Sequence, residues 1–133
     1  MQQARITLTQ FMNEQQRKIP GATGDLTGLL NDIVTASKII ANQVGKGALL
    51  ASGKDLNEKL ESMANKVMLD AAMMTGHLAA IASEDMEGIS QLPAGQARGK
   101  YLLAFDPLNG SGNLDINFQT GTIFSIMRAP DPK

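Results

Sequence analysis

The sequence predicts an α+β fold in which N-terminal helices pack on a mixed or antiparallel sheet. Apolar residues recur at helical spacing as far as Thr75, whereas short apolar runs with the length of strands follow Gly76. Helices followed by strands, without alternation of the two, are typical of helices gathered on one face of a sheet. A length of 133 residues suits one domain, and the core is expected to be aliphatic because aromatic residues make up only 4% of the chain.

Three helices are expected from the spacing of the apolar residues and from the residues that end each segment. Thr9 is the expected N-cap of the first helix, and Pro20 follows its end. The second helix has the most regular amphipathic pattern and stops at Gly45. The predicted helices span Ile6–Lys18, Leu26–Val44 and Asp55–Thr75. The third carries a stripe that is expected to be buried, made of Leu60, Met63, Val67, Met68, Ala71 and Met74.

Three strands are expected after Gly76, over residues 77–82, 101–105 and 116–127, with Gly121 interrupting the last. His77 stands at the start of the first strand as the single histidine of the chain, and we assign it no functional role. The predicted sheet is therefore built entirely from the part of the chain after Gly76.

Composition and charge exclude several classes of function. The formal net charge is −1, from 12 basic and 13 acidic residues, and no basic run suggests a nucleic-acid partner. The absence of cysteine excludes disulfides and thiolate catalysis, and one histidine cannot form a multi-histidine zinc site. The N-terminus lacks a signal peptide and no run is apolar enough to span a membrane, so a cytoplasmic protein is expected. The chemistry that remains uses carboxylates, hydroxyls, backbone groups and an oxygen-binding metal.

Acidic residues follow two of the predicted strands. Glu84 and Asp85 come after the run LAAIAS, Asp106 comes after YLLAF, and Asp115 lies beyond a turn rich in Gly, Ser and Asn. Carboxylates that converge at a sheet edge repel one another unless a hard cation such as Mg²⁺ or Mn²⁺ neutralises them. A metal there can activate water and stabilise charge on a phosphoryl group. Each signal alone is weak, because an Asp after a strand is more often a turn former or a solvated residue.

The order of these motifs resembles that of class I fructose-1,6-bisphosphatases. Residues 83–85 (SED) and 105–115 (FDPLNGSGNLD) are similar to the S-E-E and F-D-P-L-D-G-S-S-N-I-D motifs of that family. The segments TLTQFMNEQQR, VGKGAL, RGKYLLAFD and GTIFSIMR also look like bacterial members, so the resemblance runs from Thr7 to Arg128. It implies the first half of the layered sugar-phosphatase fold. It also implies Mg²⁺-dependent hydrolysis of fructose 1,6-bisphosphate to fructose 6-phosphate and phosphate, in gluconeogenesis or carbon fixation.

The resemblance assigns roles to residues at matching positions. It implies that Mg²⁺ or Mn²⁺ binds Glu84, Asp106, Asn109 and the carbonyl of Leu108. Glu61 and Asp85 are implied to prepare the attacking water. Gly110 and Ser111 are implied to receive a substrate phosphate. Asn109 stands where the family has Asp, which removes one charge from the metal site. Glu61 stands where the family has Asp, and Asp85 stands where the family has Glu. If the two side chains face each other, the methylene gained at Glu61 offsets the methylene lost at Asp85. The segment 47–59, which closes over the active site in the family, is shorter here.

The resemblance also implies a site for AMP as an inhibitor. The T-G-E-L-T motif of the family has its counterpart in TGDLT at residues 23–27, and the implied contacts are Thr23, Gly24, Asp25, Leu26, Thr27, Lys100, Tyr101 and Arg128. Backbone N–H groups at a helix N-terminus attract phosphate, and nearby Lys and Arg add positive charge. The structural alternative is that Thr23 or Asp25 is an ordinary N-cap and Tyr101 an ordinary strand aromatic.

Members of this family are much longer than the chain. Residues 1–133 are therefore expected to be the N-terminal metal- and AMP-binding domain, with the C-terminal sugar-binding half absent. An apolar surface that the second half covers should then be exposed and favour self-association, and because the family is typically tetrameric, a homo-oligomer is expected. Two hypotheses stay open: a metal-dependent phosphatase, and a truncated non-catalytic relative that binds AMP or metal or associates with full-length subunits.

Overall fold

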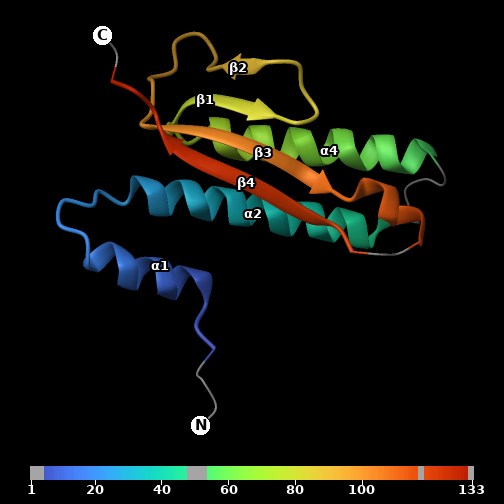
Figure 1. Ribbon diagram of the computed structural model, residues 1–133, viewed down its shortest axis with the longest axis horizontal. Helices are drawn as coiled ribbons and strands as arrows, with labels where there is room; N and C mark the ends of the chain where they lie inside the picture. The colour runs from blue at the N-terminus through green and yellow to red at the C-terminus, as the bar shows by residue number, and fades with distance from the viewer. Residues whose placement is uncertain (1–4, 48–53, 117–118, 132–133) are drawn as a thin grey trace.

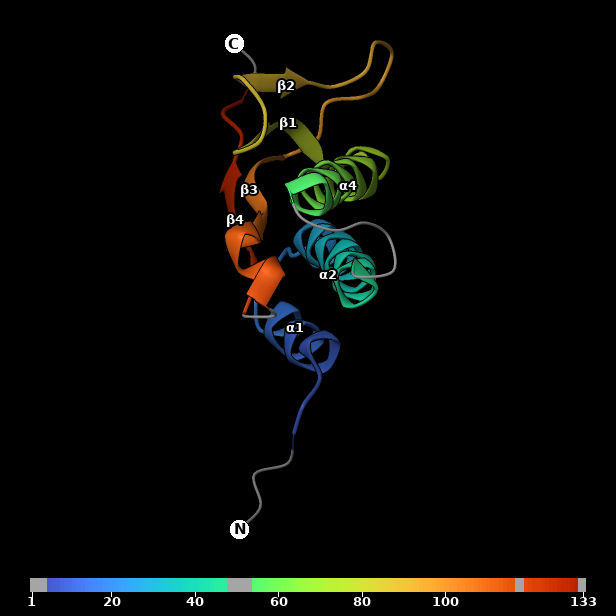
Figure 2. The same ribbon diagram turned by 90° about the vertical axis from the view of Figure 1, so that its right-hand side faces the viewer.

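The computed structural model describes residues 5–47, 54–116 and 119–131, which form a layer of helices on a sheet (Figure 1). The elements in chain order are α1 (Leu8–Arg17), α2 (Asp25–Gly45), α4 (Lys54–Met73), β1 (Leu78–Ser83), β2 (Ile89–Gln91), β3 (Tyr101–Asn109), the 3₁₀ helix η1 (Ser111–Ile116) and β4 (Gly121–Arg128). Figure 2 shows α2 and α4 side by side on one face of the four strands. The predicted α+β class, helices on a mixed sheet, is confirmed.

The first helix begins with a cap two residues before the predicted one. Thr7, not Thr9, is the N-cap of α1. Thr7 Oγ1 accepts a hydrogen bond from the Gln10 N–H at 3.2 Å, and Gln10 Oε1 accepts one from the Thr7 N–H at 2.9 Å. This reciprocal capping box satisfies two N–H groups and decides where the helix starts. Met12 is the buried residue of α1, so most of this helix faces solvent.

The core lies between the two long helices and the sheet. It consists of Leu29, Ile33, Ala36 and Ile40 of α2, Leu56, Leu60, Ala64, Met68 and Ala72 of α4, and Leu78, Ile81, Leu103, Phe105 and Leu108 of the sheet. Met68 is fully buried, as predicted, but the prediction for Met74 is wrong because that side chain is 83% exposed. Since α4 ends at Met73, helical periodicity no longer directs the next side chain toward the sheet.

The sheet has the strand order β2-β1-β3-β4, with β1 and β3 parallel and the two outer strands antiparallel to their neighbours. The strand predicted over residues 116–127 is wrong at its start, because Ile116 ends η1 and Gly121 opens β4 instead of interrupting it. β2 was not predicted, since three residues are too few to show an alternating pattern.

The outer face of the sheet is apolar and open among the residues that the structure describes. Opposed residues of an antiparallel pair share a face, so Leu102 and Ala104 lie with Met127 and Ser125 on the side away from the helices. Met127 and its neighbour on this face, Ile123, are 53% and 58% exposed. The structure therefore exposes apolar side chains on this face, and the expectation that a second half of the protein covers such a surface stays a prediction.

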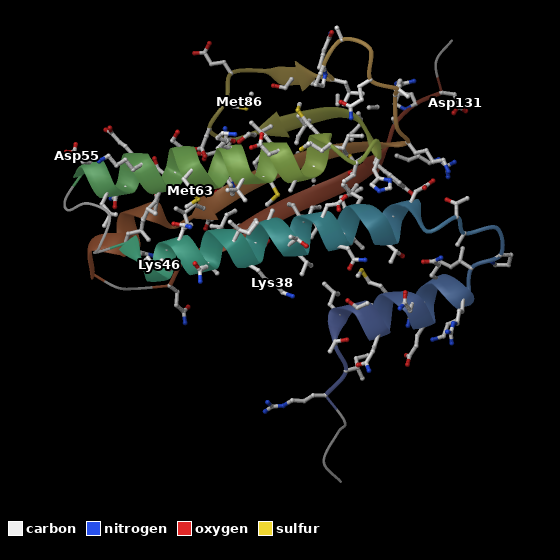
Figure 3. All side chains as sticks on the ribbon, turned by 180° about the vertical axis from the view of Figure 1, so that it is seen from behind. Lys38, Lys46, Asp55, Met63, Met86 and Asp131 are labelled. Atoms are coloured by element: carbon white, nitrogen blue, oxygen red, sulfur yellow. The ribbon has the colours of Figure 1, made fainter. Side chains whose placement is uncertain are left out.

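The helix layer turns charged residues toward solvent. Figure 3 shows the molecule from this side, where Lys38 of α2 and Asp55 of α4 are exposed. None of the helices in the described ranges is long and apolar enough to cross a membrane.

Candidate functional site

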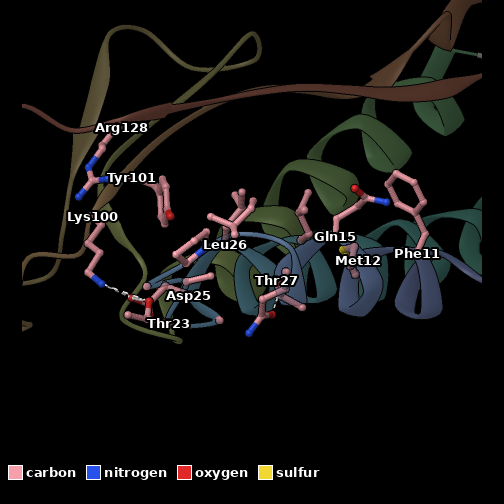
Figure 4. A pocket seen from close by; sticks show the side chains of 17 residues that line it. Phe11, Met12, Gln15, Thr23, Asp25, Leu26, Thr27, Lys100, Tyr101 and Arg128 are labelled. Atoms are coloured by element: carbon pink, nitrogen blue, oxygen red, sulfur yellow. Dashed lines mark hydrogen bonds and ion pairs between the residues drawn. The ribbon is translucent and has the colours of Figure 1, made fainter.

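A pocket of about 430 Å³ lies where α1, the start of α2 and the sheet meet (Figure 4). All eight residues of the predicted nucleotide site line it: Thr23, Gly24, Asp25, Leu26, Thr27, Lys100, Tyr101 and Arg128. In Figure 4, Lys100, Tyr101 and Arg128 stand at one end of the pocket, and Phe11 and Met12 stand at the other. The pocket therefore has a positively charged end and an apolar end.

The start of α2 forms one wall of this pocket. Gly24 is the N-cap and has a φ of +85°, a conformation that glycine adopts without strain. A Cβ on Gly24 would lie 3.3 Å from Nε2 of Gln16, whose Oε1 accepts a hydrogen bond from Thr27 Oγ1 at 2.7 Å. Gln16 thus joins the end of α1 to the first turn of α2. Because a helix N-terminus presents N–H groups and the positive end of the helix dipole, this wall suits an anion.

Lys100 is held at the polar end by Asp25. Lys100 Nζ forms an ion pair with the Asp25 carboxylate, and Thr23 Oγ1 donates a hydrogen bond to the same carboxylate at 2.8 Å. The bond from Lys100, and after it the bond from Thr23, holds the pKa of Asp25 below its ordinary value. An anion that enters the pocket therefore competes with Asp25 for the lysine.

A second group of predicted residues lies at the far end of β1, where Glu84 and Asp85 are held by their backbones. The Glu84 N–H donates to the Phe105 carbonyl at 3.0 Å, which extends the pairing of β1 with β3 by one bond. Ser83 Oγ donates to Oδ1 of Asn65 at 2.6 Å and accepts from the Asp85 N–H at 3.3 Å. Asn65 was not predicted to take part, because only the fold places this residue of α4 beside β1.

A bulge in β3 brings Asp106 and Asn109 together. Asp106 pairs with Ile123 and Asn109 with Gly121, so three steps along β3 match two along β4. Side chains three positions apart point to opposite faces of a regular strand, but here Asn109 Nδ2 donates to Asp106 Oδ2 at 2.8 Å. Pro107 sits within the bulge, where its missing N–H costs no ladder bond. The prediction that Asp106 follows the strand is wrong, since β3 continues to Asn109.

The predicted carboxylates gather at this end of the sheet. Partial burial raises the pKa of Asp85 to about 6, and the negative charges of Glu84, Glu61 and Asp106 contribute further, although the Asp85 side chain keeps contact with solvent. Glu61 comes from α4, so the fold assembles the cluster from three elements. Within residues 5–47, 54–116 and 119–131, no three His, Cys, Asp or Glu side chains lie close enough to enclose a cation. The cluster offers the oxygen atoms that Mg²⁺ prefers, without a preformed cage.

The turn after β3 carries the remaining predicted residues. Leu108 is buried, which anchors the backbone whose carbonyl was assigned to metal. Gly110 has a φ of +81° and its carbonyl accepts the Asn113 N–H at 2.9 Å, so it turns the chain directly after Asn109. Ser111 opens η1 beside it. The side chain of Asp115 and residues 48–53 of the predicted closing segment lie outside the described residues.

The apolar end of this pocket was also not predicted. Phe11, Met12 and Gln15 of α1 stand there (Figure 4). Phe11 and Gln15 are four residues apart, so they lie on one face of the helix. Phe11 is 47% exposed. A signal was therefore present in the sequence, as an apolar residue on a helix face without an assigned partner.

Comparison with known proteins identifies close relatives. The family model described as fructose-1-6-bisphosphatase, N-terminal domain, matches residues 6–133. The class 1 fructose-1,6-bisphosphatase of Halorhodospira halophila is 48% identical over 133 residues; the match covers 93% of this chain and 39% of that protein. Crystal structures of Leishmania major fructose-1,6-bisphosphatase in holo form and in T-state match with TM-scores of 0.84 and 0.81 at 30% identity. The match covers 95% of this chain for the holo form and 97% for the T-state, and in both cases 39% of the Leishmania chain.

Proposed function

The chain belongs to the fructose-1,6-bisphosphatase family, and from this premise we propose that it provides the metal-, phosphate- and nucleotide-binding part of a phosphatase. The proposed reaction is the hydrolysis of fructose 1,6-bisphosphate to fructose 6-phosphate and phosphate. The observation that carries the proposal is the grouping of Glu61, Glu84 and Asp106 around Asp85, whose pKa is raised by partial burial and then by their charges. Carboxylates beside a glycine turn match what phosphoryl transfer requires, since the turn can receive a phosphate through its N–H groups.

Asp85 is the proposed proton acceptor. A general base works best when its pKa is near the operating pH, and the pKa of Asp85 is raised to about 6. The carboxylate takes a proton from water as the water oxygen bonds to phosphorus and the bond from phosphorus to the sugar oxygen breaks, and the departing sugar oxygen takes up a proton from solvent. Glu61 supports this role because its negative charge adds to the partial burial that raises the pKa of Asp85. Gly110 and Ser111 hold the phosphate.

Glu84, Asp106, Asn109 and the Leu108 carbonyl are proposed to hold Mg²⁺ or Mn²⁺. All four supply oxygen, and Mg²⁺ is usually bound by one or two carboxylates, with waters and substrate phosphate completing its shell. Asn109 donates its amide N–H to Asp106, so Oδ1 is the atom of this side chain that can bind the cation. When bound, the cation neutralises charge on the phosphoryl group and activates water.

AMP is the proposed ligand of the pocket, where it acts as an inhibitor. A phosphate suits the end where Lys100 and Arg128 face the start of α2, and a purine ring suits the apolar end near Phe11. A volume of about 430 Å³ is typical of small-molecule sites.

A second candidate function is a nucleotide-binding module without turnover. Two observations favour it. Asn109 and Asp106 bond to each other, and no three acidic or histidine side chains of the described residues enclose a cation. The nucleotide pocket, in contrast, is lined from four elements within the same part of the chain.

Phosphate release from fructose 1,6-bisphosphate with Mg²⁺ or Mn²⁺ separates the two candidates. The parent chain, Asn109→Asp and Asp85→Asn are compared, and AMP binding is measured by calorimetry. Release that Asp85→Asn abolishes supports the phosphatase, and release only from Asn109→Asp shows a scaffold that lacks one ligand. AMP binding without release from any variant supports the binding module. Neither release nor AMP binding would contradict both functions.

The chain is also proposed to form a homo-oligomer, with a tetramer as the family form. The outer face of the sheet exposes Ile123 and Met127, and apolar surfaces of this kind favour association. Light scattering measures the mass in solution, and a stable monomer at assay concentration would contradict this proposal.

A further inference from the structure

His77 contacts both walls of the nucleotide pocket without lining it. The residue lies between α4 and β1, and its side chain is 22% exposed. Neither the carboxylate cluster nor the proposed chemistry uses it. Its position between α2 and the start of β3 therefore calls for a separate explanation.

The imidazole of His77 rests on α2, in a space that a glycine leaves open. A Cβ on Gly28 would lie 2.8 Å from His77 Nε2 and 3.1 Å from Cε1, so any other residue here would force the ring to shift. Glycine is unfavourable within a helix, which makes the close contact its physical reason at this position. Asp32 lies one turn further on the same helix face. Its Oδ2 is 4.0 Å from His77 Nε2 and is buried without a hydrogen-bond partner among the described residues.

The backbone of His77 holds the opposite wall. Its carbonyl accepts the Tyr101 N–H at 3.1 Å, and the Gly99 N–H donates to the next carbonyl, that of Leu78, at 2.8 Å. A Cβ on Gly99 would lie 2.2 Å from the carbonyl carbon of His77, so the two segments are in direct contact. Lys100 and Tyr101, which follow Gly99, line the pocket.

We propose that His77 is a positioning residue of the nucleotide pocket, whose ring holds α2 and whose carbonyl holds the start of β3. Three residues of α2 that line the pocket, Asp25, Leu26 and Thr27, directly precede Gly28. A shift of the ring therefore moves one wall relative to the other. The choice of AMP as ligand rests on the proposed function, whereas the juxtaposition of the walls does not.

A ligand-free measurement tests the positioning directly. Tyr101 lines the pocket and is the only tyrosine in a chain without tryptophan, so intrinsic fluorescence reports on this site. Gly28→Ala pushes the ring and His77→Ala removes it, and each should change the quenching of Tyr101 by acrylamide. In the double variant the new methyl group enters the vacated space, so quenching should return toward that of the parent. Gly45→Ala is the matched control, because it lies in the same helix and its Cβ would meet nothing within 4 Å.

The same variants are then compared in their affinity for AMP. Each single change should weaken binding about tenfold, equal to about 1.4 kcal/mol, and the double variant should recover most of the loss because the two effects are coupled. Circular dichroism checks folding, and His77→Gln replaces His77→Ala if the alanine variant fails to fold.

Two results would overturn the proposal. One is a Gly28→Ala variant that matches Gly45→Ala in quenching and in affinity, and the other is a double variant that shows the sum of the single effects. If the parent chain binds no AMP, the proposed nucleotide function fails. The quenching cycle still decides whether His77 positions the walls.

Discussion

Replacing Asn109 by aspartate examines the proposed metal site without any turnover. Asn109 Nδ2 donates to Asp106 Oδ2 at 2.8 Å, so Asn109→Asp exchanges a hydrogen bond for two carboxylates in contact. Without a divalent cation the variant should be less stable than the parent chain. Mg²⁺ should reverse this loss, because two adjacent carboxylates can share one cation.

The size of the loss follows from two contributions. Losing a hydrogen bond to a charged group costs about 1.5 kcal/mol. Two unit charges at about 4 Å repel by about 1 kcal/mol in water and by about 4 kcal/mol at an effective dielectric constant of about 20. Asn109 is exposed and Asp106 only partly buried, so the lower value applies. The free energy of unfolding should therefore fall by about 2.5 kcal/mol, and Mg²⁺ at 100 times its Kd should restore about 2.7 kcal/mol.

Urea unfolding followed by circular dichroism, in EDTA and in MgCl₂, measures both quantities. Asn109→Ala is the control, because it loses the hydrogen bond without adding a charge and should gain less from Mg²⁺ than Asn109→Asp does. The reasoning is refuted by an Asn109→Asp variant as stable as the parent in EDTA, or by a loss that Mg²⁺ leaves unchanged.

Three further changes probe the other contacts. Asp85→Asn should stabilise the chain above pH 6 in EDTA but not near pH 4. Because the pKa of Asp85 is raised to about 6 in the folded chain, protonation of this carboxyl stabilises the fold. That stabilisation is fully present below the ordinary pKa of 3.8 and is lost as the pH rises through 6. A pH-independent difference in thermal unfolding between Asp85→Asn and the parent chain would contradict this. Lys100→Met should abolish AMP binding measured by calorimetry. It should leave the midpoint of urea unfolding almost unchanged, because exposed ion pairs stabilise little. Retained AMP affinity would contradict the proposal that AMP binds in this pocket. Gly99→Ala should lower the unfolding free energy by about 3 kcal/mol or more, since its Cβ would meet the His77 backbone, which cannot rotate away. Urea unfolding equal to that of Gly112→Ala, whose Cβ meets nothing within 4 Å, would show that the contact is absent.

Local patterns explain which predictions were accurate. The spacing of Leu29, Ile33 and Ile40 placed α2 and its buried face, because helical periodicity is set by neighbouring residues alone. The motifs at residues 23–27 and 105–111 are contiguous, so their resemblance to the family motifs could be found before the fold was known; the roles of these residues stay predictions. Predictions failed where a boundary depends on an atomic contact. The cap at Thr7 depends on the side chain of Gln10, and the length of β3 depends on its pairing with β4.

Residue order is enough to specify the class of fold, the succession of helices and strands and the types of chemical group at each site, because these depend on periodicity and residue chemistry. How those groups meet depends on the packing of the folded chain. Lys100 pairs with Asp25 from 75 positions away, and a bulge turns Asn109 onto Asp106. His77, which directly precedes β1, rests on Gly28 of α2. Such contacts arise when the packing of helices on the sheet brings together segments that are far apart in the sequence. The conformational preferences of neighbouring residues carry no information about which distant segments will meet.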